Sequence, residues 1–142
     1  MDTELSFGKR KQRLLSLKMV EMIIINIARW DVNATVVKEV HSEPLDKATP
    51  SLTSRALELA STLSSDKTVN VRLNVGRTFG NVLSVLNTDH DLEFIISTLE
   101  AQLKSEMSRR NNGDMDVRYF AKKSISLARE RIKHLDDESS LR

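Results

Sequence analysis

The chain lacks cysteine and has few of the residues that interrupt helices. It holds two prolines and four glycines among 142 residues, and only 4% of its residues are aromatic. Without cysteine it can form neither a disulfide nor a thiolate metal site, which is typical of an intracellular protein. Leucine, isoleucine, valine, alanine and charged residues dominate instead, a composition that favours an all-α fold. The length suits one ordinary domain with a buried core.

Long apolar runs and a strong charge bias are missing too. The most apolar stretch, residues 19–28, is interrupted by Glu21 and Asn26, whereas a membrane span needs about 18 consecutive apolar residues. Asp2 and Glu4 precede any basic residue, so the N-terminus lacks the order of a secretory signal. The 22 basic and 20 acidic residues leave a net charge of +2, which gives no ground for nucleic-acid binding. We expect a cytoplasmic protein, also present in the nucleus, with no membrane or nucleic-acid partner.

The residues that usually carry catalysis are sparse and scattered. His41, His90 and His134 lie in three separate segments, and none has a nearby partner typical of a metal site or of a base–nucleophile pair. The chain also has no phosphate-binding glycine loop. We therefore expect no enzymatic activity, no catalytic residues, no cofactor and no metal.

Apolar spacing at i, i+3 and i+4 predicts helices over residues 9–30, 50–63, 68–86, 88–107 and 115–134. A short helix is also expected at 34–41. Thr49 followed by Pro50 is typical of a helix start, and Thr88 or Asp89 can cap a later one. Gly76 and Gly80 interrupt the third helix at a cost of about 1 kcal/mol each, which indicates close approach of a neighbouring helix.

The helical faces expected to point inward follow from the same spacing. They comprise Leu14, Leu17, Val20 or Glu21, Ile24, Ile25 and Ala28; Leu52, Ala56, Leu59, Ala60 and Leu63; Val71, Val75, Phe79, Val82, Leu83 and Leu86; Leu92, Ile95, Ile96, Leu99, Leu103 and Met107; and Val117, Phe120, Ala121, Ile125, Ala128 and Ile132.

A helix that begins with Val-Arg after a polar turn occurs twice in the chain. Residues 68–75 open one copy and residues 114–121 the other, so that Arg72 and Arg118 lie 46 positions apart. Paired helices at a period in the forties are typical of HEAT repeats, which stack into armadillo-like α-solenoids of antiparallel helix pairs and bind other proteins. We expect a disordered lead-in at 1–8, a partial repeat with an insertion at 9–49, repeats at 50–87 and 88–134, and a disordered tail at 135–142.

These two motifs resemble the last two repeats of the protein phosphatase 2A scaffolding (A) subunit. There, an Asn-Val-Arg-Phe-Asn-Val-type helix is followed by an Asp-Val-Asp-Val-Lys-Tyr-Phe-Ala-type helix. The resemblance covers about residues 50–132, is weak over 9–30 and is absent at 31–49. It implies a non-catalytic scaffold that binds a serine/threonine phosphatase catalytic subunit, and a further regulatory subunit, through the turns within helix pairs. Matched by position, the contacts are Asp66, Lys67 and Thr68 in one turn and Asp114 and Met115 in the next.

The two arginines are expected to be structural. In HEAT solenoids an Asp six positions before such an Arg joins a ladder of hydrogen bonds between repeats. Asp66 has that spacing to Arg72, whereas Asn112 stands before Arg118 and carries no charge, which predicts a weaker second rung.

Two other functions remain open at this stage. The Asn-Val-Arg-Leu sequence of residues 70–73 is shared with the HEAT-repeat regulatory subunit of protein phosphatase 4. A HEAT adaptor for transport or nucleic-acid-associated complexes, which would use basic helical faces, is the alternative of a different class. Steep loss of binding with salt would identify phosphate contacts and favour the nucleic-acid adaptor.

Overall fold

A computed structural model describes the backbone of residues 2–38 and 51–141, with side chains at residues 9–29 and 51–141. Every regular element in these ranges is a helix, which confirms the all-α prediction. The five α-helices are α1 (Asp2–Lys38), α2 (Leu52–Ser61), α3 (Val69–Val82), α4 (Asp89–Met107) and α5 (Met115–Ser140). Two short 3₁₀ helices, η1 (Leu83–Val85) and η2 (Arg110–Asn112), follow α3 and α4.

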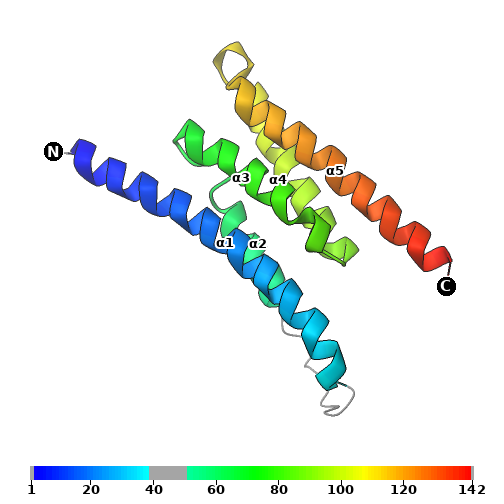
Figure 1. The fold of residues 1–142 in the computed structure, drawn as a ribbon. Helices are drawn as coiled ribbons and strands as arrows, with labels where there is room; N and C mark the ends of the chain where they lie inside the picture. The colour runs from blue at the N-terminus through cyan, green and yellow to red at the C-terminus, as the bar shows by residue number, and fades with distance from the viewer. Residues whose placement is uncertain (1, 39–50, 142) are drawn as a thin grey trace.

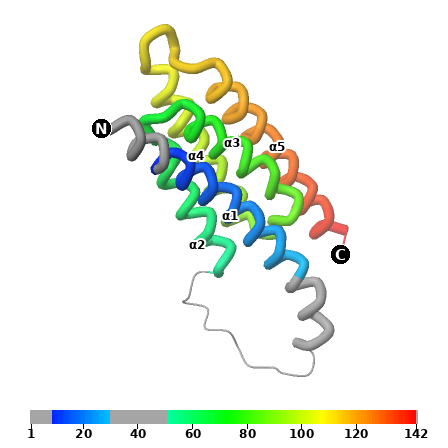
Figure 2. Tube along the Cα trace, turned by 60° about the vertical axis from the view of Figure 1, so that its left-hand side comes forward, coloured from blue at the N-terminus to red at the C-terminus, as the bar shows by residue number. Residues whose placement is uncertain are grey.

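The helices form two layers. In one layer α1, α3 and α5 lie side by side and run in the same direction, with α3 in the middle (Figure 1). The second layer holds α2 and α4, which run the opposite way (Figure 2). The closest packing joins α5 to α4 and to α3. None of the described helices combines the length and the apolarity that a bilayer crossing requires.

Three helices begin or end at residues other than those predicted. The first helix begins at Asp2 and continues to Lys38, so the lead-in is helical over residues 2–8 and the expected insertion is helical over 31–38. The last helix reaches Ser140 because Leu135 packs against the core, so the tail is helical over residues 135–140. The second helix starts at Leu52, with Ser51 as its N-cap in place of Thr49. The remaining expectations for residues 39–50 lie outside the described part of the chain.

The inward faces are as predicted for α1 and α3 and partly wrong elsewhere. All six residues expected in α3 and its extension are buried. In α2, however, Leu52 and Leu59 are 62% and 60% exposed, and Leu57 is buried in their place. Met107 is 48% exposed because Glu106 continues the buried stripe of α4. Phe120 is only half-buried.

The two helical glycines lie where α5 crosses α3. A Cβ added to Gly76 would stand 3.1 Å from the Cβ of Phe120 and 3.2 Å from its carbonyl carbon, and one added to Gly80 would stand 2.7 Å from Ser124 Oγ. The Ser124 hydroxyl also donates a hydrogen bond of 2.7 Å to the Gly76 carbonyl oxygen. The predicted close approach of a neighbouring helix is therefore confirmed.

Candidate functional site

The turn between α2 and α3 and the turn between α4 and α5 lie at the same end of the helices (Figure 1). We call this part of the surface the turn edge. It contains all five residues for which the sequence predicted a protein-binding role: Asp66, Lys67, Thr68, Asp114 and Met115.

In the first turn, two of the three candidate residues are held by α1. The Asp66 carboxylate accepts a hydrogen bond of 2.9 Å from the Thr68 backbone N–H, and its Oδ1 lies 2.8 Å from Nε of Arg13. Arg13 Nη2 also donates to the Thr68 hydroxyl over 3.3 Å. Because these contacts occupy Asp66 and Thr68, Lys67 is the only one of the three candidate residues with an exposed side chain.

A buried ion pair joins the two turns. Arg72 and Glu106 are 4% and 1% exposed, and Arg72 donates from Nε and Nη2 to the two carboxylate oxygens over 3.1 and 3.2 Å. Arg72 Nη1 donates to the backbone oxygens of Asp66 and Lys67, while Glu106 Oε1 accepts from the Asp114 N–H over 2.8 Å. Bidentate pairing with full hydrogen bonding offsets the cost of burying both charges.

In the second turn, the backbone conformation depends on left-handed residues. Asn111, Asn112 and Gly113 have φ values of 56°, 62° and 75°. A Cβ on Gly113 would stand 2.4 Å from the Glu106 carbonyl oxygen, so the turn requires glycine there. Asp114 caps α5 by accepting hydrogen bonds from two backbone N–H groups, and Met115 is 72% exposed. The turn edge therefore presents Lys67 and Met115 outward.

In the hydrogen-bond ladder, Asp66 and Arg72 have partners that the sequence analysis did not name. The Asp66 carboxylate pairs with Arg13, and Arg72 bonds to the backbone oxygen of Asp66. The rung between Asn112 and Arg118 is absent: Asn112 is exposed, and Arg118 Nε is buried without a hydrogen-bond partner among the described residues.

Glu106, which the sequence analysis missed, is the central acceptor of the turn edge. Its position on the helix could have identified it from the sequence. It follows Leu99 by seven residues and Gln102 by four, so it continues a stripe of buried residues. A carboxylate in phase with an apolar stripe indicates a buried partner of opposite charge.

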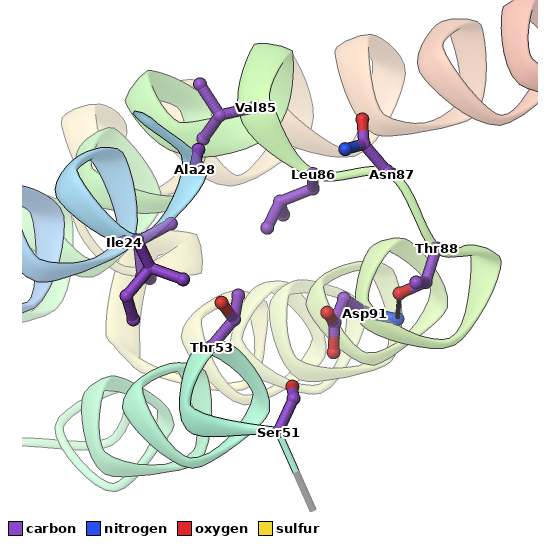
Figure 3. A pocket seen from close by; sticks show the side chains of 10 residues that line it. Ile24, Ala28, Ser51, Thr53, Val85, Leu86, Asn87, Thr88 and Asp91 are labelled. Carbon is purple, nitrogen blue, oxygen red and sulfur yellow. Dashed lines mark hydrogen bonds between the residues drawn. The ribbon is translucent and has the colours of Figure 1, made fainter. Parts of the chain in front are cut away.

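A separate concavity lies at the other end of the helices. It has a volume of about 390 Å³ and lies where α1, α2, η1 and the start of α4 meet (Figure 3). Its one buried charged group, Asp91, accepts a hydrogen bond of 2.6 Å from the Ser54 hydroxyl, and the Asp91 N–H donates to Thr88 Oγ1. These contacts serve to cap α4 and to join it to α2.

Metal-ligating side chains do not cluster in the described part of the chain, where no three His, Asp or Glu residues are placed to hold an ion. His90 is exposed, His134 Nε2 lies 3.2 Å from a carboxylate oxygen of Glu138 on the surface, and His41 lies outside the described residues.

Comparison with known proteins does not place this chain in a family. No protein-family model matches it, and no curated protein or solved structure does so.

Proposed function

We propose that this chain is a non-catalytic scaffold of HEAT-type helix pairs that holds a partner protein on its turn edge. Two successive helix pairs, α2 with α3 and α4 with α5, place their internal turns at one end of the molecule. The observation that carries the proposal is the Arg72–Glu106 pair, which fixes one turn relative to the other. A rigid edge with two projecting side chains can bind a partner without the entropy cost of ordering a mobile loop.

The partner that we favour is the catalytic subunit of a serine/threonine phosphatase of the 2A type. Support comes from the resemblance of residues 69–75 and 114–121 to the phosphatase scaffolding subunit, and from the outward placement of Lys67 and Met115. The mechanism is geometric. The stack holds the catalytic subunit beside a regulatory subunit that selects substrates, so any gain in rate comes from proximity.

The test is capture of the purified phosphatase catalytic subunit by the full chain and by a Lys67→Glu, Met115→Asp variant. Loss of an apolar anchor and of a charge contact is worth about 1–2 kcal/mol each at an interface. We therefore expect affinity to fall at least tenfold, since about 1.4 kcal/mol is a factor of ten. Both side chains are exposed, so the melting temperature should stay nearly unchanged.

The matched control is Lys133→Glu with Leu141→Asp, which likewise reverses one charge and replaces one apolar side chain by Asp, at exposed positions near the far end of α5. Capture by this control should equal that of the parent chain. Undiminished capture by the folded Lys67, Met115 variant would refute the role of the turn edge. A salt titration completes the test, because a nucleic-acid adaptor would lose its partner steeply as salt rises.

A further inference from the structure

Three arginines occupy matching places in one layer of the fold. Arg13, Arg72 and Arg118 lie in α1, α3 and α5, and each is followed seven positions later by a buried residue, which is Val20, Phe79 and Ile125 in turn. Arg13 pairs with Asp66 of the turn that precedes α3. Arg72 pairs with Glu106 at the end of α4, just before α5. Each of these two arginines thus meets a carboxylate supplied by the next helix pair.

Arg118 breaks this pattern. None of its side-chain nitrogens bonds to another described residue, and its Nε is removed from solvent. Arg72 also gains two backbone oxygens from its turn, whereas the left-handed residues 111–113 change the course of the second turn and supply no such acceptor. A donor that loses water without gaining a partner carries a free-energy penalty. The residue as a whole is partly exposed, so its guanidinium can receive an acceptor from outside the described chain.

The surface around Arg118 indicates the chemistry of that acceptor. Met115, Arg118 and Lys122 follow one another at i, i+3 and i+7, so they share a face of α5. Met115 and Lys122 are exposed. This face combines one apolar side chain with two cationic ones, and it lies away from Phe120 and Ser124, which contact α3. A carboxylate beside an apolar residue complements it in charge and in polarity.

We propose that Arg118 receives a glutamate or aspartate from a helical segment of a partner protein, with an apolar side chain of that segment packed on Met115. The contact rests on the proposed function, because it is a second point at which the scaffold holds a protein. It adds one more carboxylate to the series that Asp66 and Glu106 begin within the chain.

The close packing seen within the fold is not available to this partner. Lys122 and Ser126 stand 46 positions after Gly76 and Gly80, at the place on α5 where α3 has its glycines. A partner helix therefore cannot approach the backbone of α5 as closely as α5 approaches α3. It contacts the ends of long side chains, which predicts a reversible interaction of modest affinity.

The experiment follows the Nε–H signals of arginine in the ¹⁵N-labelled full chain by NMR. The Arg118 signal is assigned by its loss in Arg118→Lys. The probe is an alanine-rich helical peptide that carries one glutamate with leucines three positions before and four positions after it; the control peptide has glutamine instead. We expect the glutamate peptide to shift the Arg118 signal saturably and the glutamine peptide to bind at least fivefold more weakly.

Variants of the chain separate a specific contact from general attraction. Arg118→Gln should weaken binding of the glutamate peptide at least fivefold. Because Arg118 has no bond to lose, the substitution should not lower the melting temperature. Arg129→Gln, which removes an exposed arginine paired with Glu100, should leave peptide binding unaffected.

Four results would overturn the proposal: no shift of the Arg118 signal, equal binding of both peptides, tighter binding of inorganic phosphate than of the glutamate peptide, or a shift with protein concentration alone that marks a second copy as the occupant. No phosphatase is present in this experiment. If the chain fails to capture the phosphatase but binds the glutamate peptide, the proposed partner is rejected and the Arg118 contact is kept. If it captures the phosphatase but does not bind the peptide, the Arg118 contact is rejected and the proposed partner is kept.

Discussion

Glu106 is a buried carboxylate that joins α3 to the start of α5. It accepts hydrogen bonds from Arg72 and from the Asp114 backbone, and Arg109 Nε lies 3.5 Å from its Oε2. Its partners lie in α3, in the turn after α4 and at the N-cap of α5, and Arg72 is 34 positions away in the chain. A spacing rule that compares residues within one helix cannot find such a partner, which is why the sequence analysis did not identify Glu106 as the acid that pairs with Arg72.

Replacing Glu106 by Gln should destabilise the fold strongly. The substitution keeps the size of the side chain and leaves the Arg72 charge buried without its counter-charge, which typically costs about 3–5 kcal/mol. Urea unfolding measures the effect. Glu100→Gln is the matched control, because Glu100 forms an exposed pair with Arg129 and its loss should cost less than about 1 kcal/mol. Equal effects of the two substitutions would show that the buried pair has no special weight.

At the scale of single helices, prediction from sequence succeeded where one apolar phase was available. In α3, valines and phenylalanine repeat in a single phase between polar positions, so its inward face was predicted correctly. The ten-residue α2 holds Leu52, Leu57 and Leu59, which permit two phases, and packing against α1 selects Leu57. The ends of α1 and α5 were underestimated because their outer residues lack a sustained apolar repeat but contain no proline to stop the helix.

The contact between α3 and α5 predicts the effect of Gly76→Ala. Alanine favours helix formation by about 1 kcal/mol relative to glycine, but its Cβ would meet the Cβ and backbone atoms of Phe120 and Ala121 at 3.1–3.3 Å. The backbone atoms of α5 can make room only if the whole helix moves away from α3. Overpacking between two helices costs about 1–3 kcal/mol. We expect a lower melting temperature.

Ser126→Ala is the control for this substitution, because Ser126 is exposed in the interior of α5, where alanine adds helix propensity without a new contact. It should raise the melting temperature slightly. A Gly76→Ala variant that also gains stability would mean that α3 and α5 are farther apart than the structure shows.

In the molecule as a whole, α3 is the most enclosed helix of its layer, because it packs between α1 and α5. In stacks of this kind each unit is stabilised by its neighbours, so the middle unit opens last. We expect the slowest amide hydrogen exchange in α3, at residues such as Val75 and Phe79. The short α2, with two exposed leucines, should exchange faster. Hydrogen–deuterium exchange with mass spectrometry measures both, and exchange in α3 as fast as in α2 would contradict this order.

The small residues of α3 and η1 affect where along α3 the helix α5 can pack. Gly76, Gly80 and Ser84 follow one another at four-residue spacing along α3 and η1. Steric fit alone would therefore accept α5 in its present position or displaced by one helical turn, about 5.4 Å. Such a displacement would separate Glu106, which is tied to the start of α5, from Arg72. We infer that the Arg72–Glu106 ion pair fixes the position of α5 along α3 and so excludes the displaced packing.

Replacing both partners, Arg72→Met with Glu106→Leu, tests this consequence, since an apolar pair of similar size can preserve stability. The variant should remain folded while the backbone amide signal of Gly76 splits into two, one for each alignment. A single sharp Gly76 signal would show that packing alone fixes the alignment. In that case Arg72 and Glu106 would serve to hold the two turns of the turn edge together, and would not determine which of two nearly equivalent packings of α5 on α3 is adopted.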